Sequence, residues 1–164
     1  MAFVPSSLIL ANFILPVNNK CEFMNIQYIN KIDEVDWHQV SKIISIIGWG
    51  ERLPENLKTS FQKSSFVRFA YLDNELVGMG RTVDDGMYYG WIVDLAILPE
   101  HQGKGIGSYI LKELEEDLKP YISTMLTAAP GKSRFYEKLG WLKQTAAFIW
   151  PRSEEQKRAF TEDS

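Results

Sequence analysis

The stretch "LPEHQGKGIGSYIL", residues 98–111, places three glycines within five positions and then runs directly into an apolar helical repeat. Glycine inside a regular element lowers stability, so such a cluster usually marks a backbone that turns sharply or approaches a ligand closely. Before it lies the apolar run "WIVDLAIL", residues 91–98. After it, four apolar residues share one helix face until Pro120 ends the pattern: Ile106, Ile110, Leu114 and Leu118. The spacing therefore predicts a strand, a glycine-rich turn and a helix.

Two common nucleotide-binding loops do not match this stretch. It lacks the G-x-x-x-x-G-K-[S/T] pattern of a Walker loop, and its glycines are spaced G-x-G-x-G instead of G-x-G-x-x-G. A turn before a helix can nevertheless hold a pyrophosphate, because free backbone N–H groups and the helix dipole point at one place. We interpret the turn as such a cradle, against the alternative of a simple tight turn. Its residues are Gln102, Gly103, Lys104, Gly105, Ile106, Gly107 and Ser108.

The rest of the chain predicts an α/β domain with a mixed, mostly antiparallel sheet flanked by helices, in the order βααβββαβαβ. The two turns inside the three-strand region contain Asp73-Asn74 and Asp84-Asp85-Gly86. The expected elements are a strand at 25–32, helices at 33–50 and 54–64, three strands within 66–98, a helix at 106–119, a strand at 121–129, a helix at 131–140 and a strand at 142–150.

Length and composition limit the class of protein. The 164 residues suggest one domain, and a hydrophobic fraction of 45% is ordinary for a globular protein. A net charge of −3 argues against a general nucleic-acid binder. One cysteine, Cys21, and two histidines give no basis for a disulfide or a metal site, so we expect a cytoplasmic protein without a metal.

The two ends differ from the middle. Residues 1–24 are apolar but lack a basic start and contain Pro5, Asn12 and Pro16, which argues against a secretion signal or a membrane span. We interpret them as an extension upstream of the domain. The alternatives are that they pack as an extra element or mediate self-association. The expected domain covers 25–152, and 153–164 form a polar tail with a capping-box pattern at Ser153 and Gln156.

Two segments resemble the GNAT superfamily of N-acetyltransferases. "VDLAILPEHQGKGIGSYILKEL" is similar to its acetyl-CoA-binding segment, with the signature [R/Q]-x-x-G-x-[G/A], and "RFYEKLGW" to a second recurrent segment. The resemblance covers about residues 25–150 in element order. It implies that the pyrophosphate of acetyl-CoA lies on the turn Gln102–Ser108 and that the pantetheine arm lies beside the strand before it. The backbone N–H of Leu95 or Ile97 would then polarise the thioester carbonyl.

The second segment departs from the family pattern at one position. Where the family often has an asparagine seven residues before the tyrosine, this chain has Ala129. The resemblance therefore implies one contact fewer to the pantetheine arm.

The expected chemistry needs a base and an acid. Asp94 lies in an otherwise apolar strand and is the candidate that accepts the proton of the amine, directly or through water; the alternative is a structural carboxylate. Strand alternation directs Asp94 away from the face of Trp91 only if no bulge intervenes. Tyr136 matches the family's tyrosine that protonates the leaving thiolate, against the alternative of a buried structural tyrosine.

The sequence thus predicts direct acetyl transfer from acetyl-CoA to a primary amine in a ternary complex. A small-molecule acceptor is favoured over a protein, and we expect no nucleic-acid or membrane partner but a possible homodimer. Tyr88, Tyr89 and Trp91 either line an acceptor pocket or pack in the core. The main alternative is a non-catalytic acyl-CoA-binding module for regulation or interaction. The identity of the acceptor stays open.

Overall fold

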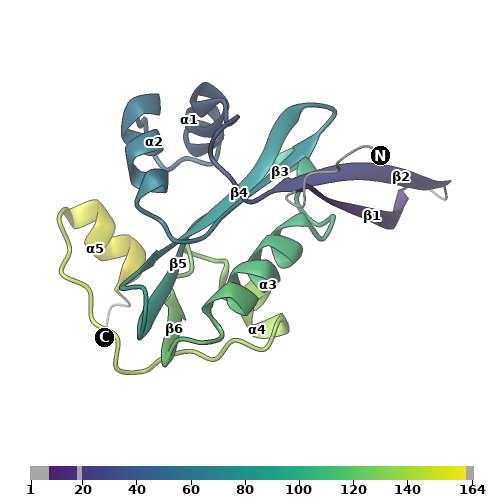
Figure 1. The fold of residues 1–164 in the computed structure, drawn as a ribbon. Helices are drawn as coiled ribbons and strands as arrows, with labels where there is room; N and C mark the ends of the chain where they lie inside the picture. The colour runs from purple at the N-terminus through teal and green to yellow at the C-terminus, as the bar shows by residue number, and fades with distance from the viewer. Residues whose placement is uncertain (1–7, 18–19, 162–164) are drawn as a thin grey trace. The chain divides into compact units, whose positions relative to one another are not determined.

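The computed structural model describes residues 8–17 and 20–161. Its sheet has six strands in the order β1-β2-β3-β4-β5-β6 (Figure 1). Neighbouring strands are antiparallel, except that β5 and β6 are parallel. The strands are β1 (Leu8–Val17), β2 (Lys20–Ile29), β3 (Val67–Leu72), β4 (Glu75–Asp84), β5 (Tyr89–Ile97) and β6 (Ser123–Leu126).

The chain divides into two compact units, Met1–Leu126 and Thr127–Ser164. The sheet belongs to the first unit, together with three α-helices and a short 3₁₀ helix: α1 (Trp37–Ile46), α2 (Pro54–Gln62), α3 (Ile106–Leu118) and η1 (Pro99–His101). The second unit contains α4 (Ser133–Lys138) and α5 (Glu154–Phe160). As the pattern predicted, Ser153 caps α5 by accepting a hydrogen bond from the N–H of Gln156.

Helix α3 packs on one face of the sheet, against β3, β4 and β5 (Figure 1). Its apolar face is fully buried, as the helical spacing predicted: Ile106, Ile110, Leu114 and Leu118. Two strand glycines allow this close approach. A Cβ at Gly80 would lie 2.9 Å from Ile110, and one at Gly90 would lie 2.5 Å from Leu118. A larger residue at either position would force the side chain that it meets, or α3 itself, to shift.

Helices α1 and α2 lie on the opposite face (Figure 1). Their contact with the sheet is aromatic: Phe61 of α2 stacks on Phe69 of β3 with ring centroids 5.4 Å apart, and Trp37 meets both rings edge-on. These ring contacts join α1 and α2 to each other and to β3. The loop between α1 and α2 reaches the centre of β5, as described below.

The predicted fold class is confirmed, but two parts of the predicted order need correction. No strand forms at 142–150; these residues are irregular, and Leu142 and Phe148 are more than 90% exposed. A segment with strand propensity forms a strand only where a neighbouring strand can hydrogen-bond to its backbone. The described part of the second unit contains no other strand. The first predicted strand also begins earlier, at Lys20, and pairs with β1 inside the segment treated as an extension.

Candidate active site

The glycine cluster forms an open turn at the N-terminus of α3. Gly103 and Gly105 have φ angles of 75° and 82°, which L-residues with side chains rarely adopt, and a Cβ at either would meet nothing within 4 Å. Gly105 is the N-cap residue, and no side chain bonds to the first turn. The first amides of α3, from Ile106 to Ser108, are thus available to an anion, as a cradle requires.

Lys104 adds a positive charge to this turn. Its Nζ lies 3.5 Å from Nδ1 of His101 at the end of η1, and both side chains are half-buried. The cradle residues therefore fit a phosphate-bearing ligand: open space, free backbone donors and a cation. The side chain of Gln102 has a structural role in the turn. Its amide donates a hydrogen bond to the carbonyl of Ile97 at 3.0 Å and so connects the turn to the end of β5.

The strand that leads into the cradle has an unpaired edge. β5 pairs with β6 only from Tyr89 to Ile92, and no other strand of the described chain borders the edge from Val93 to Ile97. The N–H of Leu98 donates to Val77 of β4, so alternation directs the N–H of Ile97, and two residues earlier that of Leu95, toward the unpaired edge. These are the two alternative backbone donors, Leu95 or Ile97, that the family resemblance implies for the thioester.

A β-bulge decides which way Asp94 points. Two residues of β5, Asp94 and Leu95, lie opposite the single residue Gly80 of β4, and Asp94 has a φ of 51°. Without the bulge, alternation would direct Asp94 toward α3. With it, Leu95 takes that position, 3.3 Å from where a Cβ of Gly80 would lie, and Asp94 shares the opposite face with Trp91.

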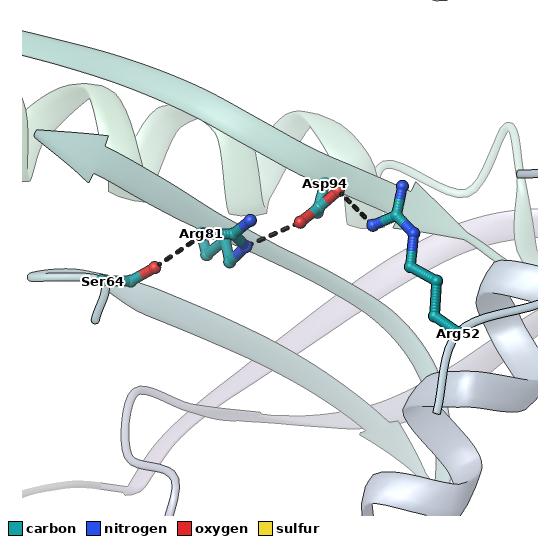
Figure 2. Close-up of polar contacts among 4 residues, drawn as sticks. All are labelled: Arg52, Ser64, Arg81 and Asp94. Atoms are coloured by element: carbon teal, nitrogen blue, oxygen red, sulfur yellow. Dashed lines mark hydrogen bonds and ion pairs between the residues drawn. The ribbon is translucent and has the colours of Figure 1, made fainter. Parts of the chain in front are cut away.

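On that face Asp94 lies between two arginines (Figure 2). Nε of Arg81 donates to Oδ2 at 2.6 Å, and Nη1 of Arg52 donates to Oδ1 at 3.2 Å. Arg81 is held further by Ser64, whose Oγ accepts from its Nη1 at 3.2 Å, and by Phe61, whose ring lies beneath the guanidinium. The Asp94 and Arg81 side chains are only 11% and 15% exposed, whereas that of Arg52 is 41% exposed.

Sequence reasoning missed both arginines as members of this site. Arg52 lies 42 positions before Asp94, in the loop between α1 and α2, and Arg81 is on the neighbouring strand. For Arg81 a signal existed: a charged residue follows the apolar run "LVGMG", which suggests a buried partner for Asp94. For Arg52 no local pattern exists, since loop residues are commonly charged.

Tyr136 belongs to the second unit and lies on α4. Burial raises the pKa of its hydroxyl, so the group stays protonated throughout the neutral range. Its ring packs edge-on against that of Phe135, with centroids 4.9 Å apart. A protonated, half-buried hydroxyl suits a proton donor, while the role itself stays a prediction.

The acidic pair Asp84-Asp85 forms the turn between β4 and β5, as predicted. Oδ1 of Asp85 accepts hydrogen bonds from the N–H groups of Met87, Tyr88 and Tyr89, and these bonds lower its pKa. Beside this turn, Tyr88, Tyr89 and Trp91 are 44–59% exposed, so they are not core residues. Trp91 and Asp94 share one face of β5, with two residues between them.

Known proteins are similar to this chain over most of its length. The model of the acetyltransferase (GNAT) family matches residues 29–141. The chain belongs to this family. It is 29% identical over 131 residues to an uncharacterised N-acetyltransferase, ycf52, of Pyropia yezoensis, covering 76% of this chain and 75% of that protein.

Solved structures agree with this assignment. A GNAT-family acetyltransferase from Streptococcus pneumoniae has a TM-score of 0.67 and 25% identity, covering 79% of this chain and 99% of its own. A putative acetyltransferase from Deinococcus radiodurans has the same fold, with a TM-score of 0.68, 23% identity and coverage of 80% and 91%. The protein is thus a GNAT-type acetyltransferase, and the family suggested by the two sequence segments is confirmed.

Two kinds of feature are absent from the described residues. No group of three or more His, Cys, Asp or Glu residues among them is arranged to hold a metal ion. No helix in that part of the chain has the length and apolar character needed to cross a bilayer.

Proposed function

We propose that this protein transfers the acetyl group of acetyl-CoA directly to a primary amine of a small molecule, in a ternary complex. The observation that carries the proposal is the continuity of two features in the first unit. The unpaired edge of β5 runs from Val93 to Ile97, and the open cradle begins five residues later at Gln102. An arm with amide groups can pair with the first, and a pyrophosphate can bind to the second.

In this reaction a bond forms between the amine nitrogen and the acetyl carbon, and the bond between that carbon and sulfur breaks. The amine loses a proton and the thiolate takes one up. The N–H group of Leu95 or Ile97 stabilises the negative charge that develops on the carbonyl oxygen. Binding both substrates together supplies much of the rate enhancement, because it removes orientational freedom before the reaction.

Asp94 accepts the proton of the amine, directly or through water. Its Oδ1 bonds to the more exposed arginine, Arg52, at 3.2 Å, and its Oδ2 bonds to the buried Arg81 at 2.6 Å. Tyr136 donates the proton to the leaving thiolate, which its raised pKa supports.

The test is release of CoA thiol from acetyl-CoA across a panel of amines, with wild-type protein, Tyr136→Phe and the control Tyr121→Phe. The hydroxyl of Tyr121 bonds to Asp84 at the turn of β4 and β5, so its loss removes a tyrosine hydroxyl outside the proposed chemistry. We expect kcat to fall roughly a hundredfold or more in Tyr136→Phe, with unchanged affinity for CoA, and to stay near wild type in the control.

The second candidate, a non-catalytic acyl-CoA-binding module, predicts tight binding of CoA with no turnover of any amine. If CoA does not bind at all, the interpretation of the cradle is wrong. Calorimetry with CoA, run beside the turnover assay, separates these outcomes.

A further inference from the structure

The Arg52 guanidinium is only partly used by the protein. It has five N–H donors, and within the described chain a single bond, 3.2 Å long, joins it to Oδ1 of Asp94. Arg81, by contrast, bonds to Asp94 and Ser64, stacks on Phe61 and is buried. Arg81 thus holds the carboxylate in place, while Arg52 presents unused donors to solvent beside it.

The loop that carries Arg52 is anchored. Ser41 of α1 donates its hydroxyl to the carbonyl of Arg52 at 2.6 Å, which fixes the backbone from which the side chain extends. The same residue lines a depression of about 540 Å³ between α1 and the following loop. Its polar lining includes Ser41, Lys42, Ser45 and Glu51. A small ligand in this depression can therefore reach Arg52, whose guanidinium is bonded to Oδ1 of Asp94.

The charges at this place restrict what can bind. Two guanidinium groups against one carboxylate leave a net charge of +1 around Asp94. A simple ammonium ion that approaches Asp94 meets this excess positive charge at short range, where it is weakly screened. An amine that also carries a negative group brings its own compensation. The planar fork of arginine is well suited to a carboxylate, which it can bind through two parallel hydrogen bonds.

We propose that Arg52 is a specificity-determining residue that binds the carboxylate of the acceptor, and that the acceptor is an amine with a carboxylate a few bonds from its nitrogen. The amine then lies at Oδ1 of Asp94 and the carboxylate on the outer donors of Arg52. This inference rests on the proposed function, because it assigns the substrate class of the same site.

The test uses matched acceptors: 4-aminobutyrate, 3-aminopropanoate and phenylalanine, each beside its own amide, in which the carboxylate charge is absent. For each pair, kcat/KM is measured with wild type, Arg52→Gln, Arg52→Lys and the control Lys58→Gln. Lys58 is an exposed cation on α2 without an ion pair to a described residue. The ratio of carboxylate to amide is compared between proteins, so differences in intrinsic amine reactivity cancel.

We expect Arg52→Gln to lower the ratio of carboxylate to amide about ten- to a hundredfold for at least one pair, as for the loss of charge-assisted hydrogen bonds. Arg52→Lys keeps the positive charge but not the planar guanidinium, so its ratio of carboxylate to amide should lie between those of wild type and Arg52→Gln. The ratio for Lys58→Gln should match wild type. An unchanged ratio in Arg52→Gln for every pair overturns the inference even if all amines are acetylated.

Binding gives a second readout that does not need turnover. Calorimetry of the same pairs in the presence of CoA should show weaker binding of the carboxylates, but not of the amides, to Arg52→Gln. If no acceptor is acetylated and this difference is still observed, the proposed function fails while the role of Arg52 in binding stands. If wild type and Arg52→Gln bind carboxylates alike, the inference is wrong.

Discussion

Removal of the Arg81 guanidinium should destabilise the protein far more than removal of the Arg52 guanidinium, although both bind the same carboxylate. Breaking a buried ion pair from one side typically costs about 3–5 kcal/mol, because a charge is left without its partner. Arg81 is 15% exposed and bonds to Asp94 at 2.6 Å, so it falls in this class. Arg52 is 41% exposed, and pairs of this kind contribute about 0–1 kcal/mol.

When Arg81 is replaced, Asp94 still has its ion pair with Arg52, and this pair offsets part of the loss of stability. We therefore expect Arg81→Gln to lower the free energy of unfolding by about 2–4 kcal/mol, which is the buried-pair value less about 1 kcal/mol for the remaining pair with Arg52. For a chain of this length that corresponds to a decrease of Tm of roughly 4–16 °C. Arg52→Gln should change the free energy of unfolding by about 1 kcal/mol or less.

The assay is urea unfolding of the wild type, Arg81→Gln, Arg52→Gln, Asp94→Asn and the double variant of Arg81→Gln with Asp94→Asn, provided that the slope with denaturant stays the same. Since the double variant leaves no buried charge unpaired, it should lose at least about 1 kcal/mol less than the two single variants together. Additive losses, or an Arg81→Gln protein as stable as Arg52→Gln, would refute the view that this pair holds the bulge of β5.

Three further outcomes follow from the structure. Gly105→Ala should cost about 1–2 kcal/mol, because φ is 82°, and calorimetry should show weaker binding of CoA; unchanged stability and affinity would contradict the cradle. Gly90→Ala places a Cβ 2.5 Å from Leu118 and should cost about 1–3 kcal/mol in urea unfolding, without altering CoA affinity per folded molecule. At Asp84, burial alone would raise the pKa, but hydrogen bonds from Ser65, Thr82, Tyr121 and Gly86 lower it overall. The group thus stabilises the fold above its unfolded pKa and ceases to do so as the pH falls through the lower folded pKa, so Asp84→Asn should flatten the acid limb of a plot of Tm against pH.

Much of the cofactor side of the site follows from local patterns. The strand, the glycine turn and α3 are encoded within residues 91–120, because helical spacing, positive-φ glycines and a terminating proline act over a few positions. The turn at Asp84-Asp85 was predicted for the same reason, since Asp85 bonds to N–H groups two to four residues ahead.

The segment 142–150 shows the limit of such patterns. It has the composition of a strand, yet it forms none, because a strand also needs a neighbour at a matching register. A local pattern contains no information on whether that neighbour exists.

The acceptor side of the site depends on contacts between distant residues. The sequence by itself determined that a carboxylate lies in the strand before the cradle, but only the tertiary structure decided where it points. The pairing of β4 with β5 places Asp94 and Leu95 opposite Gly80 and so turns Asp94 to the face of α1 and α2. There Arg81 and Arg52 reach it from 13 and 42 positions away. A strained backbone of this kind persists only where the surrounding structure stabilises it, and here that support comes from side chains that no local window of sequence contains.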